Sequence, residues 1–243
     1  MNRNIFLPIF IIAALLFGGC GVSIDVNLDK GSGSVVTETR EVSGFDRVIL
    51  SGIGELTVTQ GDTESLEIEA EDNVIQHITT EVANGTLEIS FDRRTVIPTE
   101  PVKFNLTMRS VRGLETRGVS NIQASDLTTD ELNIVISGTG NINLRDLNAD
   151  RLTVNVSGAG NFNAEGRAGD QRINMSGAGN YNGEDLESEI SSISISGLGR
   201  ATLWVTEQLD ATISGTGGID YYGSPQVNQQ ISGLGRIKHM GDK

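Results

Sequence analysis

The tetrapeptide Ser-Gly-x-Gly recurs at nearly constant spacing through the second half of this 243-residue chain. Its copies begin at Ser137, Ser157, Ser176, Ser196, Ser214 and Ser232, at spacings of 20, 19, 20, 18 and 18 residues. A degenerate copy begins at Arg117, and another copy stands far upstream at Ser51. A repeat of this length is typical of solenoid proteins, in which each unit buries its apolar face against the next.

The residues around each motif alternate between apolar and polar, as in a β-strand with one buried face. Pairs of apolar residues precede the motif at every second position: Ile134/Ile136, Val154/Val156, Ile173/Met175, Ile193/Ile195 and Ala211/Ile213. Asparagine and an apolar residue follow it in Asn121-Ile122, Asn141-Ile142, Asn161-Phe162 and Asn180-Tyr181. A third apolar set stands ten residues before the motif serine: Leu127, Leu147, Leu186, Trp204 and Tyr222.

These patterns predict an all-β fold, a parallel β-helix (β-solenoid) with about 18–20 residues per coil. An apolar period of two argues against a helical solenoid, and the framework of a leucine-rich repeat is missing. We expect a right-handed winding, which parallel crossovers prefer. The glycines are expected at corners, where φ is positive or a side chain would collide with the next coil.

Asparagines at equivalent positions of stacked coils can hydrogen-bond to one another along the stack. Two such ladders are expected if the coils are in register: Asn141, Asn161 and Asn180 in one, and Asn143, Asn163 and Asn182 in the other.

Residues 113–240 contain the repeats, whereas residues 35–112 have strand patterns that are less regular. In the latter region Asn84-Gly85 predicts a β-hairpin, and residues 72–77 predict one helical turn or a loop. We expect residues 35–112 to begin the same solenoid and to cap it, because an uncovered strand edge promotes aggregation. The polar segment 238–243 is expected to help protect the other end.

Residues 1–19 have the pattern of a signal peptide, with Arg3 before an apolar run that is too short to span a bilayer. The only cysteine, Cys20, follows Phe17-Gly18-Gly19, which resembles a bacterial lipobox with Phe17 in place of the usual leucine. That resemblance implies cleavage after Gly19 and a lipid anchor on Cys20; an ordinary signal peptide with a chance cysteine is the alternative. Residues 20–34 are then a flexible, lipid-anchored tether. In a Gram-negative cell, a residue other than Asp at position 21, here Gly21, implies sorting to the outer membrane.

The formal charge of −14 argues against nucleic acid as a partner, because phosphate binding needs a basic face. His77 and His239 stand far apart and lack the partners of a catalytic triad or a zinc site, and the Gly-x-Gly repeats lack the lysine of a phosphate-binding loop. We therefore expect no catalysis, no cofactor and no resident metal.

An acidic run could attract a divalent cation weakly, although a solvated face is the preferred interpretation: Glu64, Glu67, Glu69, Glu71 and Asp72. Trp204, Tyr221 and Tyr222 form the best candidate ligand patch.

The Ser-Gly-x-Gly-Asn repeats, together with the opening Phe45-Asp46-Arg47-Val48 and the later Asn84-Gly85-Thr86-Leu87, resemble the head GIN domain family of auto-transporter adhesins, DUF2807. The resemblance covers roughly residues 40–235. It implies an exported protein or lipoprotein with a β-helical fold, and it brings no catalytic residues.

Three functions remain open at this point. The first is a non-catalytic envelope lipoprotein, periplasmic or surface-facing, that is anchored in the membrane and presents its solenoid to an extracellular glycan or protein. The second is a carbohydrate-active enzyme, because many β-helix proteins are polysaccharide lyases or hydrolases. The third is a structural periplasmic protein that associates with itself.

Overall fold

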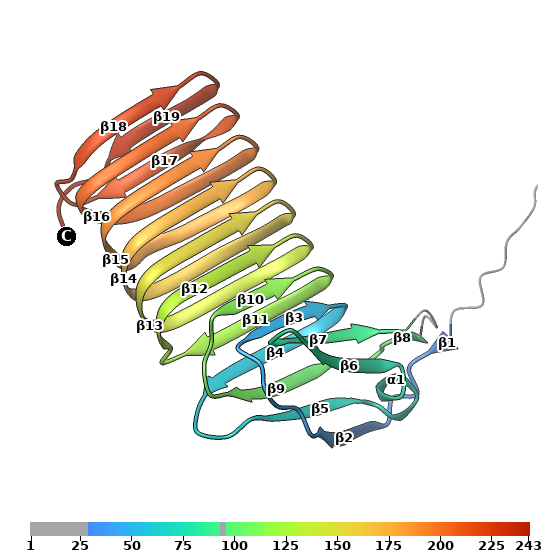
Figure 1. Ribbon diagram of the computed structural model, residues 1–243. Coiled ribbons are helices and arrows are strands. Elements are labelled where there is room, and N and C mark those ends of the chain that lie inside the picture. Colours follow the sequence, from blue (N-terminus) through green and yellow to red (C-terminus); the bar gives the residue numbers. More distant parts are fainter. Residues whose placement is uncertain (1–28, 93–95) are drawn as a thin grey trace, which may run out of the picture.

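The computed structural model describes residues 29–92 and 96–243, and its architecture is a β-solenoid of about six turns. Strands make up 74% of the structure and helix 2%, which confirms the predicted all-β solenoid (Figure 1). Its regular part consists of β12 (Thr128–Ile136), β13 (Thr139–Val156), β14 (Ala159–Met175), β15 (Ala178–Ile195), β16 (Leu198–Ile213), β17 (Thr216–Tyr222), β18 (Gln226–Ile231) and β19 (Leu234–His239).

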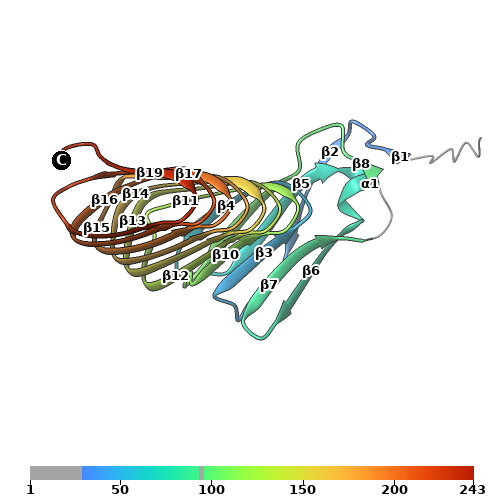
Figure 2. The same ribbon diagram turned by 90° about the horizontal axis from the view of Figure 1, so that it is seen from above.

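Each coil has two walls that are joined by two corners, as the end-on view shows (Figure 2). The first halves of the long strands stack with β11 (Val119–Ser125), β17 and β19 to form one wall, the asparagine wall. The second halves stack with β10 (Gly113–Thr116), β12 and β18 to form the back wall. We call the Ser-Gly-x-Gly corner the glycine corner, and the opposite one, near residues 145–147 of β13, the variable corner.

Coils are in parallel register, so equivalent side chains lie on top of one another. Ile142 of β13 lies opposite Phe162 of β14, which lies opposite Tyr181 of β15, and all three are buried. The rings of Phe162 and Tyr181 stack with centroids 5.2 Å apart. The Tyr181 hydroxyl donates a hydrogen bond to Oε1 of buried Gln171 at 2.5 Å, and burial raises the pKa of Tyr181. The Tyr181 hydroxyl can lie inside the coil because it is paired with Gln171 there.

At the glycine corner, the backbones of successive coils approach one another too closely for side chains. A Cβ atom on Gly158 would lie 2.0 Å from the carbonyl oxygen of Gly138, and one on Gly177 would lie 2.0 Å from that of Gly158. The same carbonyl of Gly138 accepts a 2.9 Å hydrogen bond from the amide of Ala159. Among the motif glycines only Gly54 has a positive φ. Collision between coils, rather than backbone conformation, therefore explains the repeated glycines.

The N-terminal region joins the solenoid out of sequence order. β3 (Arg47–Ser51) and β4 (Ile53–Gln60) form a coil that stacks on β10 and β11. On the other side of that coil lie β7 (Thr86–Phe91) and β9 (Lys103–Met108), which come later in the chain. The first coil in the sequence is thus the second in space, and the chain returns past it to begin the regular repeats.

Antiparallel strands terminate both walls and form the cap. β5 (Ser65–Glu71) pairs with β9, and β2 (Val35–Arg40) pairs with β5. On the back wall β6 (Ile78–Ala83) pairs with β7, and their turn has positive φ at Asn84 and Gly85, which confirms the predicted hairpin. The segment after β5 is a single helical turn, α1 (Asp72–Ile75). These less regular strands continue the solenoid, as the sequence predicts.

Residues 29–34 belong to the cap, so the predicted flexible tether is wrong for this part of the chain. β1 (Asp29–Lys30) pairs with β8 (Val96–Ile97), and the amide of Gly31 donates to the carbonyl of Ile97 at 2.9 Å. The amide of Gly33 donates to Glu71 at 2.7 Å. The signal peptide, Cys20 and tether residues 21–28 lie outside the described residues.

At the far end, residues after β19 lengthen the last coil without covering it. The amide of Met240 donates to the carbonyl of Tyr221 at 2.8 Å, and the amide of Gly223 donates to the carbonyl of Gly241 at 3.0 Å. β18 and β19 each pair with only one strand in the described structure, and Leu234 is 79% exposed. The expected protection of this end by residues 238–243 is therefore not seen, because the segment runs alongside β17.

Replacing Gly217 with alanine is expected to destabilise the protein by about 3 kcal/mol, because the new Cβ would lie 2.0 Å from the carbonyl oxygen of Gly199. The adjacent Gly218→Ala variant is the matched control, since its Cβ would meet nothing closer than 3.8 Å and should change stability by less than about 1 kcal/mol. Denaturant unfolding followed by circular dichroism measures both. Equal midpoints for the two variants would show that contact between coils is not what requires glycine.

Candidate functional site

Both asparagine ladders are present on the outer face of the asparagine wall. In the first, the side-chain amide of Asn161 donates to Asn141 at 2.8 Å, and that of Asn180 donates to Asn161 at 2.8 Å. Asn121 extends this ladder by one coil, because it accepts from Asn141 at 2.9 Å. In the second, the links are 2.6 Å each: Asn163 to Asn143 and Asn182 to Asn163.

Each asparagine inside a ladder keeps part of its hydrogen-bonding capacity for another molecule. A primary amide has two N–H donors and an oxygen with two lone pairs, and the ladder uses one donor and one lone pair. The remaining donor and acceptor repeat at the spacing of stacked strands, about 4.8 Å. The wall therefore presents a rigid, periodic array of neutral donors and acceptors.

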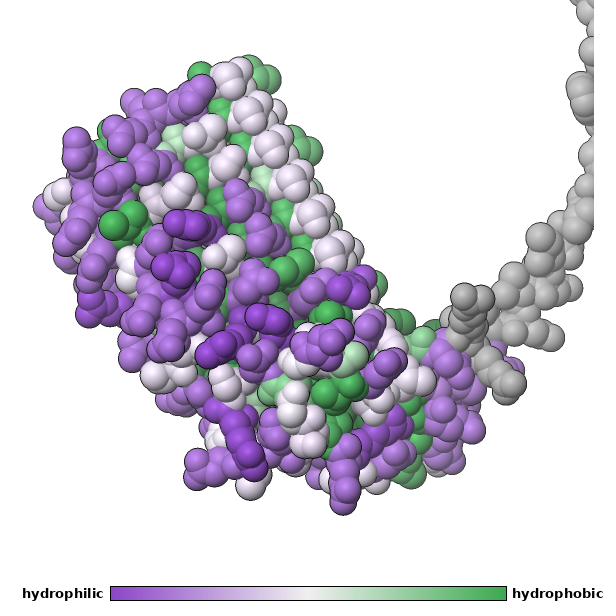
Figure 3. Space-filling model, in the orientation of Figure 1, coloured by the Kyte–Doolittle hydropathy of each residue, from purple (hydrophilic) through white to green (hydrophobic). Residues whose placement is uncertain are grey.

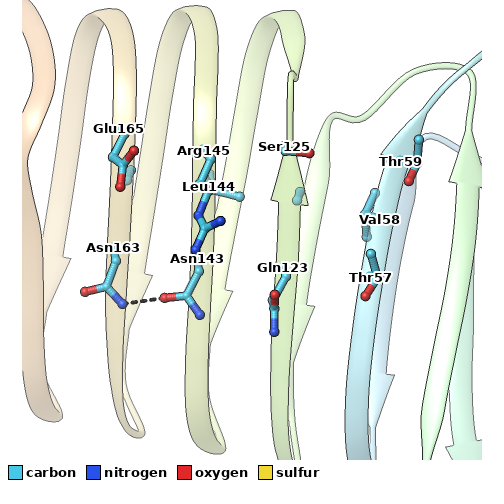
Figure 4. A pocket seen from close by; sticks show the side chains of 12 residues that line it. Thr57, Val58, Thr59, Gln123, Ser125, Asn143, Leu144, Arg145, Asn163 and Glu165 are labelled. Carbon is cyan, nitrogen blue, oxygen red and sulfur yellow. Dashed lines mark hydrogen bonds between the residues drawn. The ribbon is translucent and has the colours of Figure 1, made fainter.

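A groove of about 430 Å³ lies across this wall where β4, β11, β13 and β14 run side by side (Figure 4). Its floor is the sheet, and its outward side chains are polar: Thr57, Thr59, Gln123, Ser125, Asn143, Arg145, Asn163 and Glu165. The second ladder runs into it through the Asn143–Asn163 bond. Arg145 and Glu165 supply one positive and one negative charge toward the variable corner, so the groove suits a polar ligand.

The structure divides the three aromatic residues of the predicted ligand patch. Tyr221 lies opposite buried Leu203, packs against the end of the core and stacks on His239 at 5.0 Å. Trp204 and Tyr222 are partners in register on β16 and β17, and both are half-buried. The sequence aligned Trp204 with Leu186, but Trp204 pairs with Glu187, because the β15–β16 register shifts after Gly183.

Glu71, which the sequence placed on a solvated acidic face, is buried and holds two loops of the cap. Its carboxylate accepts hydrogen bonds from the amide of Gly33 at 2.7 Å, the amide of Thr99 at 2.8 Å and the hydroxyl of Thr99 at 2.5 Å. The hydrogen bond from the Thr99 hydroxyl is the largest of the causes that lower the pKa of Glu71 to about 2. No sequence signal indicates this buried role of Glu71, since its donors come from loops far away in the chain.

The other acidic residues of the run have separate partners. Glu69 lies 3.4 Å from the ammonium of Lys103, Glu67 accepts from Asn105 at 3.2 Å, and Asp72 accepts from Ser32 at 2.5 Å. No group of three or more His, Cys, Asp or Glu side chains is placed to hold a metal within residues 29–92 and 96–243. The acidic run is thus part of the cap's hydrogen-bonding network.

The two histidines lie at opposite ends of the molecule. His77 Nδ1 is 3.1 Å from a carboxylate oxygen of Asp92 in the cap, whereas His239 is in the last strand and stacks on Tyr221. The fold does not bring them together.

A continuous uncharged edge follows the glycine corners, and it is visible as the pale and green border of the solenoid in Figure 3. The third residue of each motif points outward here, and these residues are in register from coil to coil: Ile53, Val119, Thr139, Ala159, Ala178, Leu198, Thr216 and Leu234. Val119 and Leu198 are each 62% exposed. In a chain with a formal charge of −14, eight uncharged positions in line make this edge distinct from both walls.

Comparison with known proteins decides the family. The model of DUF2807, described as "Putative auto-transporter adhesin, head GIN domain", matches residues 44–225. The chain belongs to the head GIN domain family. No curated protein matches this family member significantly. In the described part of the chain, no helix is both long and apolar enough to cross a membrane.

Solved structures show the same fold. A crystal structure described as a "putative adhesin" from Bacteroides fragilis is 29% identical with a TM-score of 0.84, and the match covers 87% of this head GIN chain and 99% of that one. A "Putative lipid binding protein" from Parabacteroides distasonis is 23% identical with a TM-score of 0.73, covering 87% and 98%. A "putative adhesin" from the same organism is 20% identical with a TM-score of 0.67, covering 88% and 100%.

The low pKa of Glu71 predicts a loss of stability in acid. A carboxyl group whose folded pKa is about 2, compared with an ordinary 4.5, stabilises the fold above about pH 4.5, and this contribution is lost as the pH falls toward 2. Glu71→Gln should therefore be less stable than the wild type at pH 7, and the difference should shrink as the pH approaches 2. Unfolding midpoints measured between pH 7 and pH 2 test this. Glu67→Gln, on the exposed face of the same strand, is the control, and a gap that stayed constant with pH would contradict the assignment.

Proposed function

We propose that this head GIN domain protein is a non-catalytic lipoprotein of the cell envelope, anchored through Cys20, that binds an extracellular glycan on its asparagine wall. The observation that carries the proposal is the pair of amide ladders beside a polar groove. Sugar hydroxyls are both donors and acceptors, so they match an array that offers one of each per coil. A polymer with many repeating units could contact several coils at once, which raises its overall affinity.

The charge of the chain narrows the glycan class. A protein with a formal charge of −14 repels strongly anionic polymers, and Arg145 is accompanied in the groove by Glu165. We therefore expect a neutral glycan. Glycoside hydrolysis usually uses two carboxylates on either side of the bond that is cleaved, and Glu165 is the one acidic residue that lines this groove. The groove thus supports binding better than cleavage.

The N-terminal segment joins the fold at β1, and this position supports an anchor that leaves the asparagine wall accessible to a ligand. Eight residues separate Cys20 from Asp29, so β1 would lie within about 30 Å of the lipid. β1 pairs with β8, and Ile97 of β8 lines one surface depression with Ile53 and Val119 at the start of the uncharged edge. The edge, rather than a wall, would then be the part nearest the membrane, since β1 lies beside β8 at the cap end of the solenoid (Figure 1).

Cys20→Ser should release the protein from the membrane. We expect the wild type to incorporate labelled palmitate and to sediment with membranes, and the variant to be unlabelled and soluble. Because Cys20 is the only cysteine, no disulfide is lost in the variant. An unlabelled wild type, or a variant that stays in the membrane fraction, would contradict the anchor.

The mature chain without its lipid should bind at least one neutral polysaccharide on a glycan array. Asn163→Ala removes a ladder amide inside the groove and should weaken binding about 3- to 10-fold, the value of a lost hydrogen bond or two. Asn155→Ala is the matched control, since it breaks one 3.1 Å amide link with Asn174 on the back wall. Absence of any bound glycan, or equal weakening by both variants, would rule out the asparagine wall as the binding surface.

A further inference from the structure

At the variable corner of the last coils, four groups surround the ammonium of Lys243. Its Nζ lies 5.3 Å from the ring centroid of Trp204 and 5.5 Å from that of Tyr222. The same nitrogen donates hydrogen bonds of 2.5 Å to Oδ1 of Asp185 and to the carbonyl oxygen of Glu184. We call Trp204, Tyr222, Asp185 and the Glu184 carbonyl the ammonium cage.

Three consecutive strands build this cage. Trp204 of β16 and Tyr222 of β17 are opposite each other in register, so their rings are one coil apart. In β15 the register with β16 shifts between Gly183 and Glu187, which leaves Glu184 and Asp185 without partners on β16, although Asp185 pairs with Glu165 of β14. These residues of β15 thereby bring a carboxylate and a backbone carbonyl to the same ammonium that the two rings face.

The cage has the chemistry of a receptor for a primary ammonium group. Aromatic faces within about 6 Å attract a cation, and a carboxylate pairs with it. The carbonyl and the carboxylate both accept hydrogen bonds, which a primary ammonium can donate and a quaternary ammonium cannot. A neutral sugar would gain neither the charge pairing nor the attraction to the ring faces.

Lys243 can leave the cage without disturbing the fold. Its neighbours are fixed by the backbone bonds of Met240 and Gly241 and by a 2.7 Å hydrogen bond from Ser224 to Asp242. The contacts with the cage are made by the end of the Lys243 side chain, and Asp185 is 62% exposed beside it. The side chain is therefore a tethered occupant in a site that is open to solvent.

We propose that the ammonium cage binds a primary ammonium group of an external partner, and that Lys243 occupies the site until the partner displaces it. This binding site is separate from the groove on the asparagine wall and does not depend on glycan binding there. Two sources carry the required group: the side chain of a lysine in a protein, and the amine of an unacetylated amino sugar.

The only tryptophan of the chain, Trp204, is part of the cage, so its fluorescence reports on occupancy directly. The fluorescence of the Lys243→Ala variant should change in a saturable way when it is titrated with Nα-acetyl-lysine amide or with glucosamine. Whichever amine has the lower Kd shows whether a protein lysine or an amino sugar supplies the ammonium group. In the wild type the apparent Kd should be at least about tenfold higher, because the tethered lysine competes at a millimolar effective concentration. Tetramethylammonium at equal ionic strength should bind about tenfold more weakly than the tighter primary amine, since it donates no hydrogen bond.

Two further variants separate binding from folding. Lys103→Ala removes a lysine of the cap that pairs with Glu69, and should titrate as the wild type does. Asp185→Asn in the Lys243→Ala background keeps both rings and should abolish most of the response; circular dichroism checks that this variant is folded. The proposal is overturned if Lys243→Ala shows no saturable change, if tetramethylammonium binds as tightly as the primary amines, or if Asp185→Asn has no effect.

Discussion

Close contact between the backbones of successive coils at the glycine corner determines most of this structure. A Cβ at these positions would lie about 2 Å from a carbonyl oxygen of the preceding coil, as at Gly158, Gly177 and Gly217. The contact repeats in every coil and holds the two walls in parallel register. This register places residues from equivalent positions of successive coils on top of one another. The asparagines therefore form ladders, and the apolar residues form a continuous core.

The number of residues is constant at the glycine corner and differs from coil to coil at the variable corner. Repeat length varies between 18 and 20 residues, yet the strands stay paired at the glycine corner throughout. The register shifts all fall at or beyond the variable corner: after Leu144, after Asn163, and between Gly183 and Ile190. Because the strands of both walls stay paired, the number of residues at the variable corner can change from coil to coil without moving the core. The ammonium cage is built from one of these irregularities.

The sequence predicted what is periodic and missed what depends on contacts across the chain. The motif, the alternation and the ladders could be read from residues at a fixed spacing, which is the spacing of the coils themselves. Nothing periodic shows that β3 inserts between β7 and β10 and β4 between β9 and β11, or that Glu71 receives donors from Gly33 and Thr99. The alignment of Trp204 failed for the same reason, since an irregular β15 breaks the counting that a repeat allows.

The asparagine wall changes its chemistry along the stack, and this limits where each kind of ligand can bind. The first ladder runs from Asn121 to Asn180, and the next residue in register is Arg200, followed by Gly218 and Arg236. Amide hydrogen bonding between coils on this wall therefore stops at β15, and Arg200 and Arg236 of the later coils present charge instead. The groove runs from β4 to β14 and the cage lies on β15 to β17, so the two sites occupy successive parts of the same stack. A partner that carried both sugar hydroxyls and a primary amine could engage both sites along one solenoid, because parallel register holds them at a fixed distance.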